Sequence, residues 1–238
     1  GVVGFLDRIG FLELVPYGLI LLLIVGLMML EPHMSGTILI LAGAAAVLFA
    51  AGIKLYWFAG GGAALMGLVV LMMSGYQSTR ILVWQDPWAY PRDGGYQIIQ
   101  SLYAIGSGGL LGLGLGKSRQ KFLYLPEPEN DFIFAIVCEE LGLIGAGIVL
   151  ILFALLVMRG YWIAIHARDR FGALLVVGIT TLTAVQVFLN ISVVTNLIPT
   201  TGISLPFFSY GGTALMIQLA EMGIILSVSR QIPAPRQE

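Results

Sequence analysis

Long apolar stretches alternate with shorter polar segments along most of the chain. A helix that crosses a bilayer needs roughly 20 mostly apolar residues. Six stretches reach or approach that length, at about residues 13–30, 36–53, 56–75, 132–158, 172–197 and 212–229. The pattern predicts an all-α polytopic membrane protein with six transmembrane helices. We expect residues 1–238 to form a single membrane domain.

The composition supports a membrane protein and excludes an ordinary soluble globule. Of the 238 residues, 58% are hydrophobic and 11% are charged, whereas a soluble domain usually carries about 25% charged residues. The formal net charge is −1 and the basic residues are few and scattered, so no nucleic-acid partner is expected. Most of the 31 glycines fit membrane helices, in which small residues let backbones approach closely.

Lysine and arginine residues in the short connections predict the orientation, because these residues favour the cytoplasmic side of a membrane. If the predicted spans alternate, one side holds Arg8, Lys54, Arg159, Arg168, Arg170, Arg230 and Arg236. We expect that side, which includes the C-terminus, to be cytoplasmic.

The opposite side then carries a large extracytoplasmic loop between the third and fourth spans, at residues 76–131. Connections longer than about 12–15 residues are usually functional or disordered, and this one has too many aromatic residues to be disordered. Residues 96–116 begin with helical spacing of apolar residues and then become rich in glycine. They predict a short amphipathic helix near the outer surface, followed by a flexible turn and the basic sequence KSRQK.

The sequence gives little indication of a nucleotide-binding site or a metal-binding site. The sequence GLGLGKS at 112–118 lacks the first glycine of a P-loop, because that position is Leu111. His33 and His166 fall on opposite sides of the membrane in the predicted topology and have no ligand spacing, so we predict no metal site from them. Cys138 is the single cysteine and cannot form a disulfide within the chain.

Carboxylic acids at the start of the fourth span are the sharpest candidates for chemistry. Asp131, like Asn130, could cap the helix that follows. Alternatively, the helix dipole could keep its carboxyl group ionised so that it accepts a proton from an attacking hydroxyl. Glu139 and Glu140 lie within the apolar stretch, where ionisable groups are costly and usually paired or functional. We expect at least one to face the interior and find a partner, and Glu221 raises the same question more weakly.

A basic cluster, formed by Lys117, Arg119 and Lys121, precedes these acids. It could contact anionic lipid headgroups. It could equally bind the phosphate of a lipid-linked substrate, because lysine and arginine stabilise phosphoryl charge.

Several ordered motifs resemble the SEDS family of shape, elongation, division and sporulation proteins, which includes FtsW, RodA and SpoVE. The matching segments are LEPHMSGT at 30–37, YQIIQSLYAIGSGGLLGLGLGKSRQKFLYLP at 96–126, LPEPENDFIFAIVCEELGLIG at 125–145 and NISVVTNLIPTTGISLPFFSYGG at 190–212. The resemblance implies a peptidoglycan glycosyltransferase of the bacterial cytoplasmic membrane. Such enzymes polymerise lipid II, a sugar linked to undecaprenyl pyrophosphate, and work with a class B penicillin-binding protein.

The resemblance also implies roles for residues. Asp131 matches the essential aspartate of the family pattern PE-x-x-x-DFIFA and becomes the expected catalytic residue, with Glu139 and Glu140 as supporting buried polar residues. The residues expected to bind substrate are Lys117, Arg119, Lys121, Gln100, Ser107 and Glu127. The resemblance implies no particular cofactor, although a divalent cation could help to neutralise the pyrophosphate.

The chain departs from the family pattern in two respects. His33 stands where the family often has an aspartate, so that loop is not expected to supply a carboxylate. Family members typically have ten transmembrane helices, and the six predicted here resemble the last six. The first residues do not form a signal peptide and lack a starting methionine, so the chain could be an incomplete, inactive fragment.

Two alternative functions stay open. A lipid II flippase would suit buried acids in glycine-rich spans, although no inverted repeat is evident. A non-enzymatic membrane scaffold that recruits the penicillin-binding protein is the other.

Overall fold

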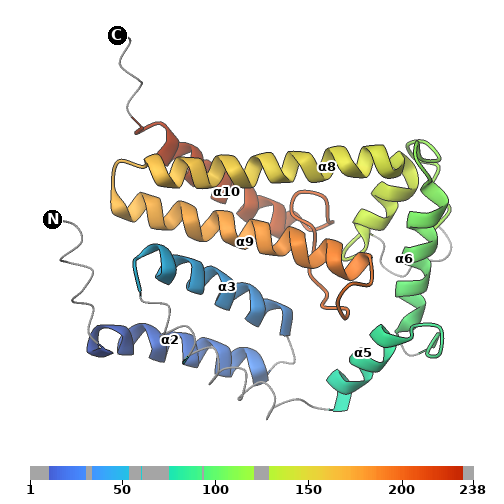
Figure 1. Ribbon diagram of the computed structural model, residues 1–238, viewed down its shortest axis with the longest axis horizontal. Helices are drawn as coiled ribbons and strands as arrows, with labels where there is room; N and C mark the ends of the chain where they lie inside the picture. Colours follow the sequence, from blue (N-terminus) through green and yellow to red (C-terminus); the bar gives the residue numbers. More distant parts are fainter. Residues whose placement is uncertain are drawn as a thin grey trace, which may run out of the picture.

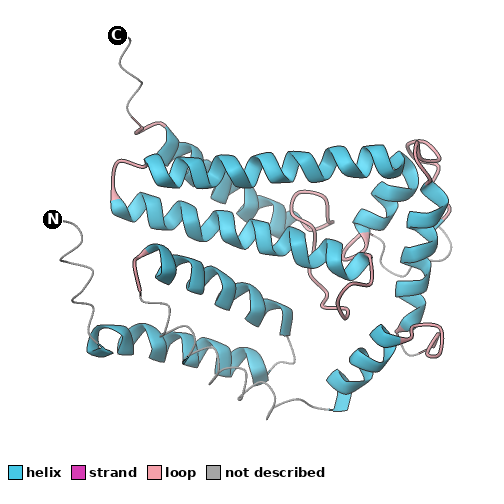
Figure 2. Cartoon of the chain, viewed as in Figure 1, coloured by secondary structure: helices cyan, strands magenta, loops and turns pink. Residues whose placement is uncertain are grey.

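The computed structural model describes residues 11–30, 34–53, 60, 75–92, 94–120 and 129–232. Within these ranges every regular element is a helix (Figure 2). The helices are α2 (Phe11–Leu30), α3 (Met34–Ala50), α5 (Gly75–Gln85), α6 (Gly95–Gly108), α8 (Ile133–His166), α9 (Arg170–Val194) and α10 (Gly212–Ser229).

Five of the six predicted spans coincide with a helix, and most of the third, at 56–75, lies outside the described residues. Among the described residues, three helices, α8, α9 and α10, are long and apolar enough to cross a membrane. Shorter apolar helical segments lie at Val15–Met28 and Gly36–Ala50. The described part of the chain is therefore that of a helical membrane protein.

Helix α9 lies at the centre of the described helices and contacts both α8 and α3. Figure 1 shows α8 and α9 side by side, with α3 and then α2 on the other side of α9. The main core joins α6, the beginning of α8, α9 and the connection that follows α9, through buried residues that include Ala104, Phe134, Val187 and Leu205. This core holds together the segments that carry the expected site.

Helix α6 lies across one end of α8 and α9 (Figure 1). Ile98, Ile99 and Ala104 are buried, whereas Tyr96 and Tyr103 are exposed. Ser101, which is fully buried, donates a hydrogen bond from Oγ to the carbonyl of Val194 at 2.8 Å. The amphipathic helix predicted to begin near residue 96 is confirmed.

Helix α8 is not the single continuous span predicted over 132–158. Gly142 has φ 68° and ψ −171°, which interrupts the helix, and Figure 1 shows the first part folding back from the long second part. This conformation is open essentially to glycine alone. The helix also continues to His166, so Arg159 lies within α8 and not in the connection to α9.

Candidate functional site

Asp131 lies in the turn that leads into α8, half-buried beside the connection between α9 and α10. A Cβ atom placed on Gly202 would lie 3.5 Å from Asp131 Oδ2, so the carboxyl group borders the backbone of that connection. The interpretation of Asp131 or Asn130 as the helix cap is wrong: the N-cap position is Phe132, and no side chain caps the helix there.

Three successive carbonyl groups, those of residues 129–131, are held by hydrogen bonds from distant parts of the chain. Tyr210 N donates to the first at 2.8 Å, and Ser209 Oγ donates to the second at 2.6 Å. Asn190 Nδ2 donates to the third at 2.8 Å and also to Ile203 O at 2.7 Å. The main chain at Asp131 is thus tied both to α9 and to the connection that follows it.

The connection itself, residues 195–211, is held from two sides. Gln218 on α10 accepts a hydrogen bond from Phe207 N at 2.8 Å. On the other side, Arg80 on α5 donates to Thr200 O at 3.1 Å. These contacts support the segment that borders the Asp131 carboxyl group.

Glu139 is buried, with 1% of its surface exposed. Its Oε2 accepts a hydrogen bond from Ser118 Oγ at 2.5 Å, and its Oε1 accepts one from Arg119 N at 3.1 Å. Glu140 is half-buried and accepts a longer bond from Ser118 N at 3.4 Å. The prediction that at least one of the two acids faces the interior and finds a partner is confirmed.

The expected substrate-binding residues fall into separate places. Lys117 and Arg119 are exposed on the loop that follows α6. Gln100 is half-buried on α6, and Ser107 is exposed on the same helix, where its Oγ donates to the carbonyl of Ala104 at 3.0 Å. The remaining residues, Lys121 and Glu127, lie outside the described residues, as does His33.

The basic loop is held to the far end of the first part of α8, not to Asp131 directly. Eight residues separate Asp131 from Glu139, which is roughly 12 Å along a helix. The structure therefore places the backbone amides of Ser118 and Arg119 against Glu140 and Glu139, one short helical segment away from the aspartate.

Several residues that build this region are not predicted by the sequence. Four side chains make hydrogen bonds to residues far away in the sequence: Asn190, Ser101, Ser118 and Ser209. Asn190 carried a signal, because a strongly polar side chain within an apolar span is costly and usually finds a specific partner. In the part of the chain that the structure describes, no three His, Cys, Asp or Glu side chains form a group that could hold a metal ion.

Fold and composition define a helical membrane protein, and comparison with known proteins identifies its family. Residues 9–233 match the model of the cell cycle protein family of FtsW, RodA and SpoVE, and the chain belongs to this family. It is 50% identical over 206 residues to stage V sporulation protein E of Bacillus subtilis, covering 86% of this chain and 56% of that protein.

Two further relatives agree. The chain is 44% identical to the probable peptidoglycan glycosyltransferase FtsW of Geobacter sp. (strain M18), covering 91% of this chain and 60% of that protein. It is also similar to a chain in the solved structure of a peptidoglycan synthase complex. That complex is described as coordinating polymerization and crosslinking. That match has 31% identity and a TM-score of 0.73, and it covers 91% of this chain and 61% of that chain. The chain thus spans about three-fifths of the length of each of these three relatives.

Proposed function

We propose that the protein to which this chain belongs is a peptidoglycan glycosyltransferase that polymerises lipid II at the outer face of the bacterial cytoplasmic membrane. It would cross the membrane several times, with the six predicted spans among its helices and its C-terminus in the cytoplasm. A class B penicillin-binding protein would be its partner. Family membership supports this proposal, as do the relatives described as glycosyltransferases and as part of a peptidoglycan synthase complex.

The observation that carries the proposal is the way Asp131 is held. Three hydrogen bonds fix the main chain at residues 129–131 to α9 and to the connection after it, so the aspartate is carried by a rigid support. A group that must meet a reacting hydroxyl gains from such support, because catalysis depends on a defined geometry. Asp131 would act as the general base that removes the proton from the attacking hydroxyl, a role typically worth about 10²–10⁴ in rate.

In the proposed reaction, the 4-hydroxyl of a terminal N-acetylglucosamine attacks the anomeric carbon of the sugar on undecaprenyl pyrophosphate. Asp131 takes the hydroxyl proton, the new glycosidic bond forms, and the pyrophosphate leaves with the electron pair of the broken bond. One direct displacement inverts the anomeric carbon. Lys117, Arg119 and Lys121 would stabilise the negative charge of the leaving pyrophosphate.

Polymerisation of lipid II by the intact protein with its partner tests this assignment. Asp131→Asn keeps the size of the side chain and removes the base, so we expect the rate to fall by about 10²–10⁴. The matched control is Glu129→Gln, which makes the same chemical change two residues away on an exposed side chain and should leave the rate within about twofold. Normal glycan chains from Asp131→Asn would refute the catalytic role.

The same preparation separates the two alternative functions. A flippase would move labelled lipid II between the leaflets of a vesicle without forming polymer. A scaffold would leave polymer synthesis unaffected by Asp131→Asn so long as the complex with the penicillin-binding protein forms.

A further inference from the structure

The interruption of α8 at Gly142 is filled by the glycine-rich loop that follows α6. A broken helix leaves amide and carbonyl groups without partners on both sides of the break. Here the loop supplies two carbonyls for the amides after the break and two amides for the carbonyls before it. The four bonds, donor first, are Leu143 N to Gly109 O at 2.9 Å, Ile144 N to Leu110 O at 3.2 Å, Leu113 N to Glu139 O at 2.9 Å and Gly114 N to Glu140 O at 3.0 Å.

Glycine is required on both sides of this junction. A Cβ atom on Gly142 would overlap the amide nitrogen of Gly112, and one on Gly112 would overlap the carbonyl oxygen of Glu140. Both glycines also have positive φ, 68° and 77° respectively, where other residues are strained. The loop and the break therefore fit as one unit, with two backbones in direct contact.

A second set of bonds fixes the far end of the same loop. Ser118 is buried, with 3% of its surface exposed, and its hydroxyl and the Arg119 amide both donate to the carboxyl group of Glu139. Lys117 and Arg119, on either side of Ser118, are exposed. The buried acid thus holds the middle of a short segment whose two basic side chains project outward.

We propose that Glu139 is a positioning residue that, through Ser118 and the Arg119 amide, holds Lys117 and Arg119 where they bind the pyrophosphate of the lipid-linked substrate. This inference rests on the proposed function for the identity of the ligand. Holding the segment in one conformation before binding reduces the ordering cost of binding. Glu139 therefore acts on substrate binding and does not touch the reacting atoms.

The change Glu139→Gln tests this role because it replaces a carboxyl group that accepts two hydrogen bonds by an amide that accepts at one atom only. The glutamine oxygen can accept from the Arg119 amide and its NH₂ group can donate to the Ser118 hydroxyl, so weaker neutral bonds replace those to the carboxyl group. In lipid II polymerisation by the intact protein with its partner, we expect the KM for lipid II to rise roughly three- to tenfold with kcat within about twofold. Ser118→Ala, which deletes the hydroxyl, should raise KM in the same direction by about tenfold or less.

Two comparisons define the scale of the effect. The double variant Lys117→Ala, Arg119→Ala removes the basic side chains themselves and should raise KM at least as much as Glu139→Gln. Glu140→Gln, whose bond to Ser118 is longer at 3.4 Å, should have a smaller effect than Glu139→Gln.

A spin label tests the positioning without any enzyme assay. Leu115 is 77% exposed within the loop and can be labelled as Leu115→Cys in a Cys138→Ala background. We expect the label to become more mobile with Glu139→Gln or Ser118→Ala and to stay unchanged with Asp131→Asn.

The outcomes of these experiments distinguish the role of Glu139 from the phosphate-binding role of the basic side chains. Unchanged KM and unchanged label mobility in both Glu139→Gln and Ser118→Ala would overturn the role of Glu139. A fall in kcat with unchanged KM and mobility would also overturn it, because the residue would then act on the chemical step. If the double basic variant binds lipid II normally, the phosphate-binding part of the proposed function fails, and the label still shows whether Glu139 holds the loop.

Discussion

Asn190 shows how a single side chain can hold the region around Asp131. It is 1% exposed within α9, and its Nδ2 donates to the carbonyls of Asp131 and Ile203, which belong to different segments. Buried carbonyls without a donor are costly. The side chain therefore links the start of α8 to the connection after α9 and fixes their spacing.

Replacing Asn190 by leucine should destabilise the protein, because the carbonyls of Asp131 and Ile203, one part-buried and one buried, would lose this donor. We expect a loss of about 1–3 kcal/mol in the free energy of unfolding, measured as a lower midpoint of thermal unfolding in detergent, together with reduced lipid II polymerisation. Gln186→Leu is the matched control on the same helix: Gln186 is half-buried and makes one long bond, 3.4 Å, to Ser204. Equal stability of the two variants would contradict the bridging role of Asn190.

For single residues, the sequence predicted which acids are important but did not predict the residues that hold them in place. Burial of Glu139 followed from the cost of a charged group in an apolar stretch. Asp131 was a candidate from its position before the fourth span, and the family motif then selected it from among the other acids. Its capping role was wrong because the helix begins one residue later, at a cap position without a side-chain bond. Its actual supports, Asn190 and Ser209, bond across 59 and 79 positions, and no local pattern predicts such contacts.

At the scale of the element, α8 combines two helical segments whose junction depends on another part of the chain. Hydropathy predicted most of the described membrane helices, because the length of an apolar stretch is enough to indicate such a helix. It did not predict the break at Gly142, because glycine is common in membrane helices and usually serves packing. The partner of the break, the loop after α6, lies about 30 residues earlier in the chain.

Substitutions at two glycines of α8 distinguish a glycine that the helix break requires from one that it does not require. Gly142→Ala should lower the free energy of unfolding by at least about 1–3 kcal/mol, because the new methyl group overlaps Gly112 and the residue keeps a strained backbone. Gly147→Ala, in the same helix with no atom within 4 Å of the added Cβ, should be neutral or stabilise by up to about 1 kcal/mol. Thermal unfolding of both variants in one detergent measures the contrast, and a stable Gly142→Ala protein would mean that the helix can straighten without loss.

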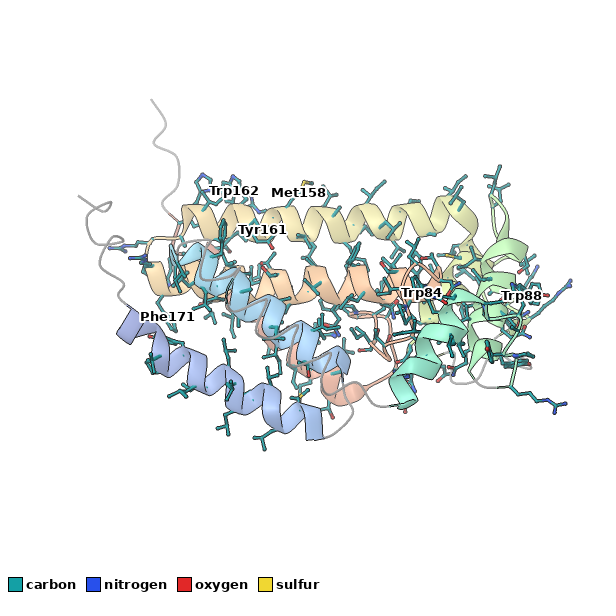
Figure 3. All side chains as sticks on the ribbon, turned by 60° about the horizontal axis from the view of Figure 1, so that its bottom comes forward. Trp84, Trp88, Met158, Tyr161, Trp162 and Phe171 are labelled. Carbon is teal, nitrogen blue, oxygen red and sulfur yellow. The ribbon has the colours of Figure 1, made fainter. Side chains whose placement is uncertain are left out.

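The whole molecule has two distinct ends. Figure 3 shows Trp84 and Trp88 at one end of the described helices and Trp162 and Phe171 at the other. Tryptophan is enriched where a membrane meets water, so these positions fit the two faces of a bilayer. The first end carries α6 and the basic loop, and the second carries the connection between α8 and α9 (Figure 1).

The proposed topology makes these ends face opposite sides of the membrane, with the α6 end outside. Arg92 precedes α6 and Arg168 lies between α8 and α9, and both are exposed, so the same change to cysteine can be made at each. In a Cys138→Ala background, a membrane-impermeant maleimide should label Arg92→Cys in right-side-out spheroplasts and Arg168→Cys only in inverted vesicles. The positive-inside rule leads to this result, because the short connections on the Arg168 side carry the basic residues. Labelling of Arg168→Cys in intact spheroplasts would reverse the orientation and put Asp131 on the wrong side of the membrane for polymerising exported lipid II.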